Sequence, residues 1–430
     1  MLSLHHHSTF STLDGYGLPE QIVAKAKELG REAVALTEHD NVFSHPYLQE
    51  ACDKAGLKPI FGCEMRLVRD ISRNSREKYH ITVISRTQAG YTNLMKLVSK
   101  SYSREYFYYR PTIDIAALKE HSNGITILSG CPSSLMNGYI LSGNIDKAIE
   151  LAKEFKDIFG EYYYLEIMPH DMDETKIIAP AVKKISQIVG VPIVITNDEH
   201  YFERGQHKIQ RILHAIRNRS DIWNVGSSIP SLYLMDDEQA FQHAKLHIGD
   251  FFSNEELLTL FNNQEKIAAD CNVRIPKSGF VDYGSSNPFE ELKERAYDGL
   301  SRIGEANTNV YLDRIEKELD LIYRKGFANY FLVVSDIVGW AKRSGILVGP
   351  SRGSSACSLV AFLMGITETN PIKHGLIMER FLSEDRNDLP DIDIDFEDRK
   401  RDLVIQYMHE RFSRDNVAHL STLVRFTGRN

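Results

Sequence analysis

Hydrophobic and polar positions follow one rhythm over residues 1–275. Short apolar runs typical of buried strands alternate with segments whose apolar residues recur at helical spacing. The runs are SLHHHST, EAVALTEH, KPIFGCEMRLV, YHITVISRT, GITILSG, YYYLEIM and VPIVITNDEH. Strands that alternate with helices indicate an α/β fold with a parallel sheet, and we expect a barrel.

The rhythm changes at about Pro276. Two long polar helices are predicted over 287–304 and 307–326, and an apolar helix over 328–345. A glycine- and serine-rich turn, another helix and an acidic strand over 389–397 follow. We therefore expect two domains, 1–275 and 276–430.

Composition narrows the class of protein. The chain has 430 residues, of which 42% are hydrophobic and 26% charged, as in soluble globular proteins. It has no membrane-length apolar run and no secretory signal, and its five cysteines are scattered without metal or disulfide spacing, so we expect a cytoplasmic protein. A net charge of −8 argues against binding nucleic acid by bulk charge, but it allows a local basic groove.

The histidines near the N-terminus predict a metal site. Side chains alternate along a strand, so His5 and His7 share one face and His6 points away. Neutral imidazoles paired in this way bind zinc and related metals. The alternative is the remnant of a purification tag.

Other predicted strands carry similar residues at their ends. In an α/β barrel these ends meet at one edge, where the chemistry of such folds collects. Each residue alone could be an ordinary surface or core residue, but their shared position predicts a metal cluster. The residues are Asp14, His39, Glu64, His80, Cys131, Asp198 and His200.

A second acidic site is predicted near the C-terminus. On a strand, Asp391, Asp393 and Asp395 share one face. Carboxylates this close repel one another, and magnesium ions would neutralise them. The alternative is an exposed acidic edge strand.

The turn GPSRGSSACS, upstream of these aspartates, could bind phosphate. Its backbone N–H groups and the following helix offer donors to phosphate oxygens, and Arg352 adds a charge. A plain glycine turn would look similar. The turn is not a P-loop, because no Gly-Lys-Ser/Thr follows.

The motifs HHHSTFSTLDG, ALTEHDNVF, PIFGCE, HITVISRTQAGYTNLMKLVS, ILSGC and ITNDEHY resemble the PHP (polymerase and histidinol phosphatase) domain. They are most similar to the version that begins the alpha subunit of bacterial or phage DNA polymerase III. The resemblance implies a distorted (β/α)7 barrel, roughly two or three zinc, manganese or iron ions, and 3′–5′ exonuclease activity. Glu38, where Asp is common, is expected to support the ligands. The implied ligands are His5, His7, Asp14, His39, Glu64, His80, Cys131, Asp198 and His200.

Residues 276–430 resemble the first part of an α+β polymerase palm from the same family. The resemblance implies that Asp391 and Asp393 are catalytic and bind Mg²⁺, whereas some members of the family have no acidic residue at the position of Asp395. It also implies that Arg352, Gly353 and Ser354 contact the triphosphate. The family's third catalytic aspartate, thumb and fingers lie beyond Asn430. We therefore expect a truncated polymerase, or one product of a split gene, that does not extend a primer alone.

The resemblance also implies partners: primer–template DNA, dNTPs, the missing polymerase part and, through absent regions, the sliding clamp and replisome subunits. A free-standing PHP phosphoesterase is an alternative, but it leaves residues 340–400 without a purpose. A non-catalytic scaffold that docks a separate proofreading subunit is another, but it does not need a complete ligand set. Metal analysis and substrate choice separate the three.

Overall fold

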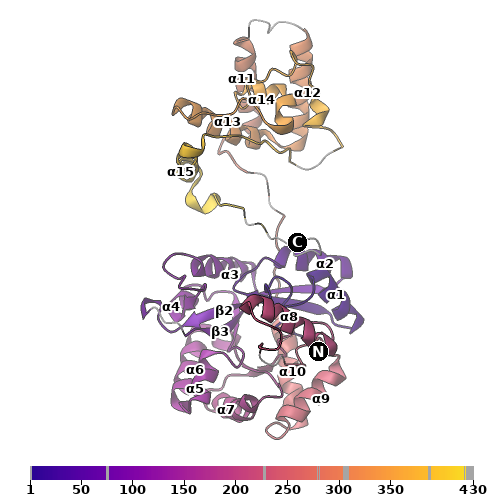
Figure 1. Ribbon diagram of the computed structural model, residues 1–430, viewed down its shortest axis with the longest axis vertical. Helices are drawn as coiled ribbons and strands as arrows, with labels where there is room; N and C mark the ends of the chain where they lie inside the picture. The colour runs from indigo at the N-terminus through magenta and orange to yellow at the C-terminus, as the bar shows by residue number, and fades with distance from the viewer. Residues whose placement is uncertain are drawn as a thin grey trace. The chain divides into compact units, whose positions relative to one another are not determined.

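The computed structural model describes residues 2–73, 77–225, 229–277, 279, 281–303, 309–385, 389–420 and 422. The chain divides into two compact units, Met1–Pro276 and Lys277–Asn430 (Figure 1). Among the described residues, no helix has both the length and the hydrophobicity needed to cross a bilayer.

The first unit is built on one sheet with strand order β1-β2-β3-β5-β6-β7, and β4 pairs with β2. Most neighbours are parallel, but β3 runs antiparallel to both β2 and β5. The prediction of an all-parallel sheet was therefore wrong at β3, because the spacing of hydrophobic residues carries no strand direction. The strands are β1 Ala33–His39, β2 Lys58–Val68, β3 Tyr79–Ser85, β4 Ile113–Asp114, β5 Ile125–Leu128, β6 Tyr163–Ile167 and β7 Ile193–Ile195.

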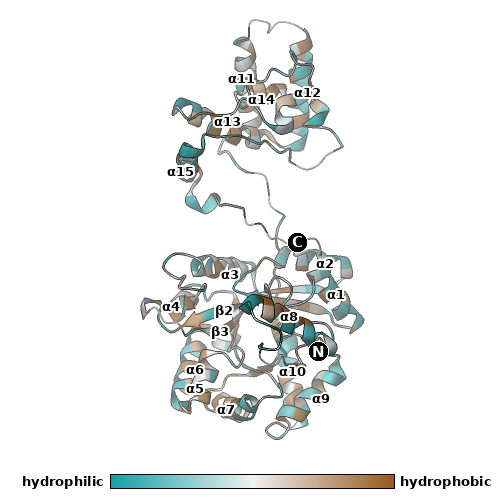
Figure 2. Ribbon diagram, viewed as in Figure 1, coloured by the Kyte–Doolittle hydropathy of each residue, from teal (hydrophilic) through white to brown (hydrophobic). Residues whose placement is uncertain are grey.

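Helices surround this sheet and confirm the α/β class. In α7, for example, Ile178, Val182 and Ile185 are buried, and both apolar and polar positions are visible along the helix (Figure 2). The largest core joins side chains of the sheet with those of α3, α6, α7 and α10. The helices are α1 Pro19–Glu28, α2 His45–Ala55, α3 Gln88–Ser101, α4 Ile115–Glu120, α5 Leu135–Leu141, α6 Ile145–Phe159, α7 Asp173–Val189, α8 His207–Asn218, α9 Asp237–Ile248 and α10 Asn254–Asp270.

The N-terminal segment bridges the two edges of the sheet. The backbone N–H of His7 donates to the carbonyl of Glu199, beyond β7, and the N–H of Glu199 donates to the carbonyl of His5. On the other side, the N–H of Thr37 in β1 donates to the carbonyl of His6. The predicted strand SLHHHST is thus wrong as a regular strand, because only His6 forms a bridge. These few bonds still place residues 5–7 between β1 and the chain that follows β7.

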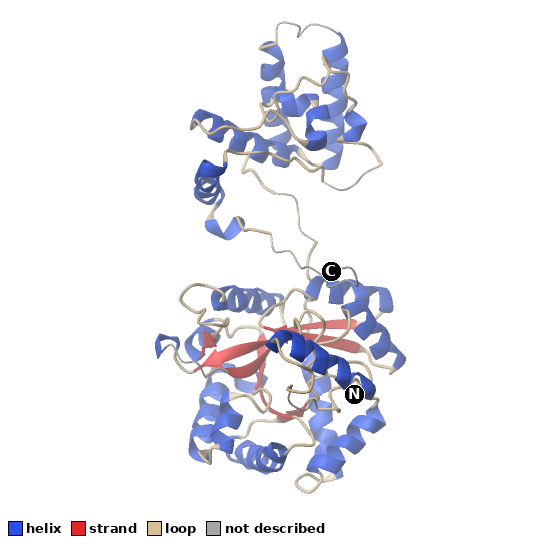
Figure 3. Ribbon diagram, viewed as in Figure 1, coloured by secondary structure: helices blue, strands red, loops and turns tan. Residues whose placement is uncertain are grey.

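The second unit is helical over its described residues (Figure 3). Its core is formed by apolar faces of the helices, with Phe331 and Leu332 fully buried. The predicted strand 389–397 is wrong as a regular strand: among the described residues it has one bridge, Phe396 with Val348. Because only Val348, of the described residues, pairs with this segment, the pairing does not reach the aspartates. The helices are α11 Pro288–Ser301, α12 Asn309–Lys325, α13 Ala328–Arg343, α14 Leu359–Leu363 and α15 Arg401–Phe412.

Candidate metal centre

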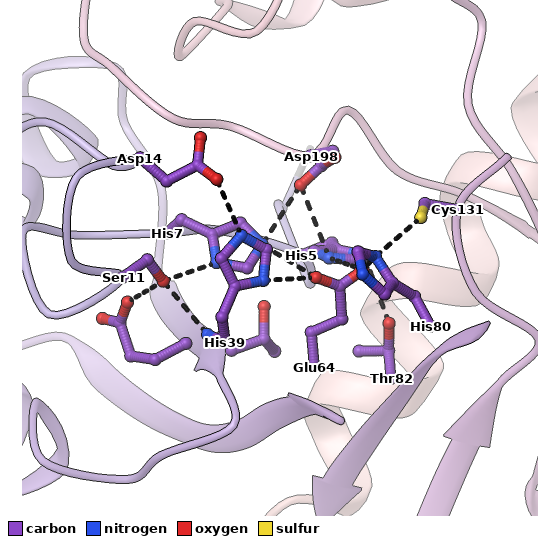
Figure 4. A network of polar contacts seen from close by, with 12 residues as sticks. His5, His7, Ser11, Asp14, His39, Glu64, His80, Thr82, Cys131 and Asp198 are labelled. Carbon is purple, nitrogen blue, oxygen red and sulfur yellow. Dashed lines mark hydrogen bonds and ion pairs between the residues drawn. The ribbon is translucent and has the colours of Figure 1, made fainter. Parts of the chain in front are cut away.

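A cluster of histidines and carboxylates lies at one end of the sheet of the first unit (Figure 4). Glu64, in β2, is central: its Oε1 lies 2.8 Å from Nδ1 of His80, and its Oε2 lies 2.6 Å from Nδ1 of His39. Nε2 of His5 and Nε2 of His7 lie 3.5 Å and 3.8 Å from the same carboxylate. Side chains from three other segments therefore meet around one glutamate.

The remaining sequence-predicted ligands surround this glutamate. Oδ1 of Asp198 lies 3.4 Å from Nε2 of His5 and 3.2 Å from Nε2 of His7. Three groups have donor atoms within 4.8 Å of one another, and all predicted ligands but Asp14 and Asp198 fall in at least one of them. The groups are His7–His39–His200, His5–His7–Glu64 and Glu64–His80–Cys131.

His80 shows why strand direction matters. It stands near the start of β3, whereas His39 and Glu64 stand at or toward the carboxyl ends of their strands. Because β3 is antiparallel to β2, His80 faces Arg66 and Thr82 faces Glu64 in the register. The start of β3 therefore lies at the same edge as the ends of its neighbours.

Several buried nitrogen and oxygen atoms of the cluster have no hydrogen-bond partner. Nε2 of His5, Nε2 of His7 and Oδ1 of Asp198 make no hydrogen bond, although both Nε2 atoms lie within 3.4 Å of Oδ1 of Asp198. Leaving a buried polar atom unsatisfied costs about 1–3 kcal/mol. Their convergence fits a site where these atoms bind a metal ion.

The protonation states of His7 and Glu64 suit metal binding. Burial, with His39 and His200 nearby, lowers the pKa of His7 to about 3, so its imidazole is neutral. Burial alone would raise the pKa of Glu64, but His80 and His39 hold it well below its ordinary value, and the carboxylate is ionised. Neutral imidazoles and ionised carboxylates are the forms that bind metals. Burial would lower the pKa of His39, but Glu64 and Asp14 raise it to about 10, so this histidine would release a proton on binding a metal.

Side chains behind the cluster orient the ligands. Glu166, in β6, lies 2.9 Å from Nδ1 of His5. Ser11 donates its hydroxyl hydrogen to Glu38, so its oxygen accepts from Nδ1 of His7, 2.8 Å away. Both histidines therefore turn Nε2 toward the centre. Sequence analysis missed Glu166, although a carboxylate within the apolar run YYYLEIM was a signal.

Asp14 is held from α8, to which sequence analysis assigned no site residue. Nε2 of His214 lies 2.6 Å from Oδ1 of Asp14, and Nη1 of Arg217 donates to Oδ2 of Asp14 at 2.7 Å. Gln210 donates to the same carboxylate at 3.2 Å. Burial would raise the pKa of Asp14, but His214 holds it well below its ordinary value. The spacing 210, 214, 217, which repeats along one helical face, was the available signal.

In the second unit, the acidic segment keeps the predicted alternation. Asp391, Asp393 and Asp395 are exposed, and Ile392 between them is buried. The N–H of Gly349 donates to the carbonyl of Asp395 at 2.8 Å. This bond brings the acidic segment beside the glycine- and serine-rich turn.

The turn approaches the carboxylates directly. Nη1 of Arg352 donates to Oδ1 of Asp395 at 3.0 Å. Gly353 begins a 3-10 turn, Gly353–Cys357, with φ +63°, and a Cβ built on it would lie 3.1 Å from Oδ2 of Asp393. Glycine suits this position on both counts. Arg352 and Gly353 therefore lie against the acidic segment, with half-buried Ser354 next along the turn.

Comparison with known proteins places both units. Residues 3–170 match the PHP domain family, and residues 290–430 match the family described as the bacterial DNA polymerase III alpha NTPase domain. The chain contains a PHP domain followed by a DNA polymerase III alpha domain. Among solved structures, an amidohydrolase from Chromobacterium violaceum is 15% identical to this chain, with a TM-score of 0.32 over 46% of this chain and 87% of its own.

Curated relatives match almost the whole chain. The chain is 36% identical to "DNA polymerase III subunit alpha" of Treponema pallidum, over 97% of this chain and 36% of the relative. The Aquifex aeolicus protein of the same name is 35% identical, over 97% of this chain and 38% of the relative. The chain thus spans less than two fifths of the length of these relatives.

The geometry of the PHP domain makes a prediction about its histidines. His7→Ala is expected to lose at least about one metal ion per chain, because His7 belongs to two of the three donor groups. His6→Ala is expected to keep its metal, because His6 is buried but belongs to none of these donor groups. Elemental analysis of the two purified variants, with circular dichroism as a folding control, tests this. Equal metal loss would contradict the assignment.

A buried glutamate stabilises the segment that follows the glycine- and serine-rich turn of the second unit. Glu318, in α12, is 1% exposed. It accepts hydrogen bonds from the N–H groups of Leu359 and Val360, at 2.9 Å and 3.0 Å, and from the hydroxyl of Ser358 at 2.8 Å. Nε of Arg314 donates to it at 2.7 Å. Glu318 therefore satisfies donors at the start of α14, which lack partners within the helix.

Glu318→Ala is expected to destabilise the second unit by about 3–5 kcal/mol, because it leaves the half-buried Arg314 guanidinium without its carboxylate and the N–H groups of Leu359 and Val360 without acceptors. Glu318→Gln should cost less, since its amide oxygen still accepts. The chain has two tryptophans. In a Trp223→Phe background, urea unfolding followed by the fluorescence of Trp340, which stacks on Tyr407, isolates this domain. An unchanged midpoint in Glu318→Ala would contradict the prediction.

Proposed function

We propose that residues 1–276 form a metal-dependent phosphoesterase that removes nucleotides from the 3′ end of DNA. The observation that carries this proposal is the convergence of unpartnered, buried Nε2 and carboxylate atoms on one point. The match to the PHP family supports the phosphoesterase class. Relatives named DNA polymerase III subunit alpha make DNA the expected substrate.

The mixed set of imidazoles, carboxylates and one thiol suits zinc, manganese or iron. Divalent cations held there would supply Lewis-acid polarisation of a phosphodiester and a nucleophilic water at neutral pH. The protein's own groups orient His5 and His7 through their Nδ1 atoms, which contact Glu166 and Ser11, so that both Nε2 atoms face the centre. The buried carboxylate of Glu64 and the partly exposed carboxylate of Asp198 would balance the cationic charge. The metal-holding residues are those that the sequence predicted: His5, His7, Asp14, His39, Glu64, His80, Cys131, Asp198 and His200.

Substrate preference tests this function. The purified chain, supplied with Mn²⁺ or Zn²⁺, is expected to shorten 5′-labelled single-stranded or mispaired DNA from its 3′ end. The chelated protein should be inactive, and added metal should restore activity. Activity on nitrophenyl phosphate far above that on DNA would favour a free-standing phosphoesterase. Metal-replete protein that binds no metal would favour a non-catalytic scaffold.

We further propose that residues 277–430 contribute to the nucleotidyl-transfer site of a longer polymerase. The contact of Arg352 and Gly353 with the acidic segment supports this second function. Asp391 and Asp393 would bind Mg²⁺, and Arg352, Gly353 and Ser354 would contact the triphosphate. Primer–template DNA, dNTPs and a polypeptide that supplies the rest of the relatives' length are the partners this function requires. A sliding clamp and other replisome subunits would bind outside this chain.

A further inference from the structure

We propose that an exposed aromatic loop, residues 102–110, binds single-stranded nucleic acid beside the metal cluster. The proposal rests on the phosphoesterase function proposed above and names the surface that guides its substrate. Tyr102, Phe107 and Tyr109 are 51%, 45% and 69% exposed, which is unusual for large aromatic side chains so close together in sequence. Tyr102 and Phe107 also lie against each other, with ring centroids 6.1 Å apart.

The tip of this aromatic loop is held in a defined shape. Tyr109 has φ +60°, a conformation that non-glycine residues rarely adopt, between Tyr108 and Arg110, which bridge each other. Nζ of Lys78 donates to the carbonyls of Tyr108 and Arg110 and, at 2.6 Å, to the hydroxyl of Thr112. The backbone therefore presents the Tyr109 ring to solvent instead of folding it into the core.

The base of the aromatic loop is attached to the strands that carry the cluster. Lys78, which holds the loop, precedes His80 by two residues. The loop leads into β4, whose Ile113 pairs with Leu67 in β2, next to Arg66. Arg66 is itself opposite His80 in the register. The loop therefore joins the sheet at the edge where Nδ1 of His80 lies 2.8 Å from Oε1 of Glu64.

Positive charge gathers at the same place although the whole chain carries −8. Exposed Arg110 lies in the loop itself, and Lys78, whose Nζ donates to the carbonyl of Arg110, brings a second positive charge to the same turn. Arg66, nearby in β2, is paired with Asp40. Like charges set close together in this way suit an anionic ligand.

Exposed aromatic rings beside Lys78 and Arg110 suit the binding of single-stranded nucleic acid. Unpaired bases stack on aromatic side chains, while lysine and arginine follow the phosphates. A duplex keeps its bases stacked internally and offers the rings little. The expected ligand is therefore single-stranded DNA or RNA whose end reaches the metal cluster.

Binding without turnover tests this inference. The probe is a 5′-fluorescein oligo(dT) of about 12 nucleotides with a phosphorothioate 3′ linkage, and the readout is fluorescence anisotropy with the full chain. Tyr109→Gly removes the ring and keeps the turn, because glycine accepts φ +60°. We expect it to raise Kd about tenfold. Tyr109→Trp should bind as the wild type does.

Two further variants sharpen the result. Arg110→Gln should reduce the slope of log Kd against log salt concentration by about 0.7, as the loss of one phosphate contact to a single strand does. Tyr323→Ala removes a tyrosine that is 63% exposed but lies in the second unit, and it should leave Kd unchanged. Equal weakening by Tyr323→Ala and Tyr109→Gly would overturn the inference, and so would equal affinity of the wild type for a duplex of the same length.

The outcome separates this inference from the function on which it rests. If the chain cleaves DNA and Tyr109→Gly binds as the wild type does, the loop assignment is wrong and the phosphoesterase stands. If Tyr109→Gly loses affinity but no chain cleaves DNA, the loop assignment stands and the phosphoesterase is wrong.

Discussion

Glu64→Gln is expected to empty most of the metal cluster and to reduce phosphoesterase turnover by about 10³-fold or more. Glu64 is the carboxylate that faces both His39 and His80, and it belongs to two of the three donor groups. The amide of glutamine keeps the volume but loses the negative charge that balances bound cations. Elemental analysis and single-turnover cleavage of labelled DNA measure the two effects.

Glu38→Gln is the matched control for this variant. Glu38 is as deeply buried as Glu64, but it acts through Ser8 and Ser11 and does not face the cluster. It should keep nearly all its metal and lose less activity. Metal loss as large as that of Glu64→Gln would show that burial of charge, and not ligation, governs metal content.

Asp391→Asn and Asp393→Asn are each expected to reduce primer extension by about 10³-fold or more, while exonuclease activity stays unchanged. Two-metal phosphoryl transfer needs ionised carboxylates to hold the ions that align the primer 3′ oxygen with the triphosphate. The assay requires this chain together with a polypeptide that supplies the remaining length of its relatives. Template-directed extension, measured beside exonuclease activity in the same preparation, tests both halves of the expectation.

Asp398→Asn serves as the control in that assay. Asp398 lies three residues beyond Asp395, in the 3-10 turn Asp398–Lys400, outside the alternating acidic face. It should leave extension unchanged. Asp395→Asn should have an intermediate effect, because Asp395 already pairs with Arg352. Equal losses in Asp393→Asn and Asp398→Asn would contradict a specific metal site.

The sequence predicted the elements of the PHP domain well, because hydrophobic spacing is a local property. The run KPIFGCEMRLV matches β2 from end to end, and EAVALTEH contains all of β1. Predictions failed where pairing depends on distant partners. Residues 3–9 and 389–397 have strand-like alternation, but each finds only one isolated bridge among the described residues.

The identity of the candidate ligands followed from the sequence, since residues that follow strands of one sheet meet at its edge. Alternation alone placed His5 and His7 together and His6 apart, as the structure has them. The partners behind these ligands needed the tertiary structure: Glu166 is 161 residues from His5, and His214 is 200 residues from Asp14. The antiparallel direction of β3, which brings His80 to Glu64, was also decided there. Periodicity specifies which face of an element is buried, whereas packing between segments far apart in the chain selects strand direction and the neighbours of each side chain.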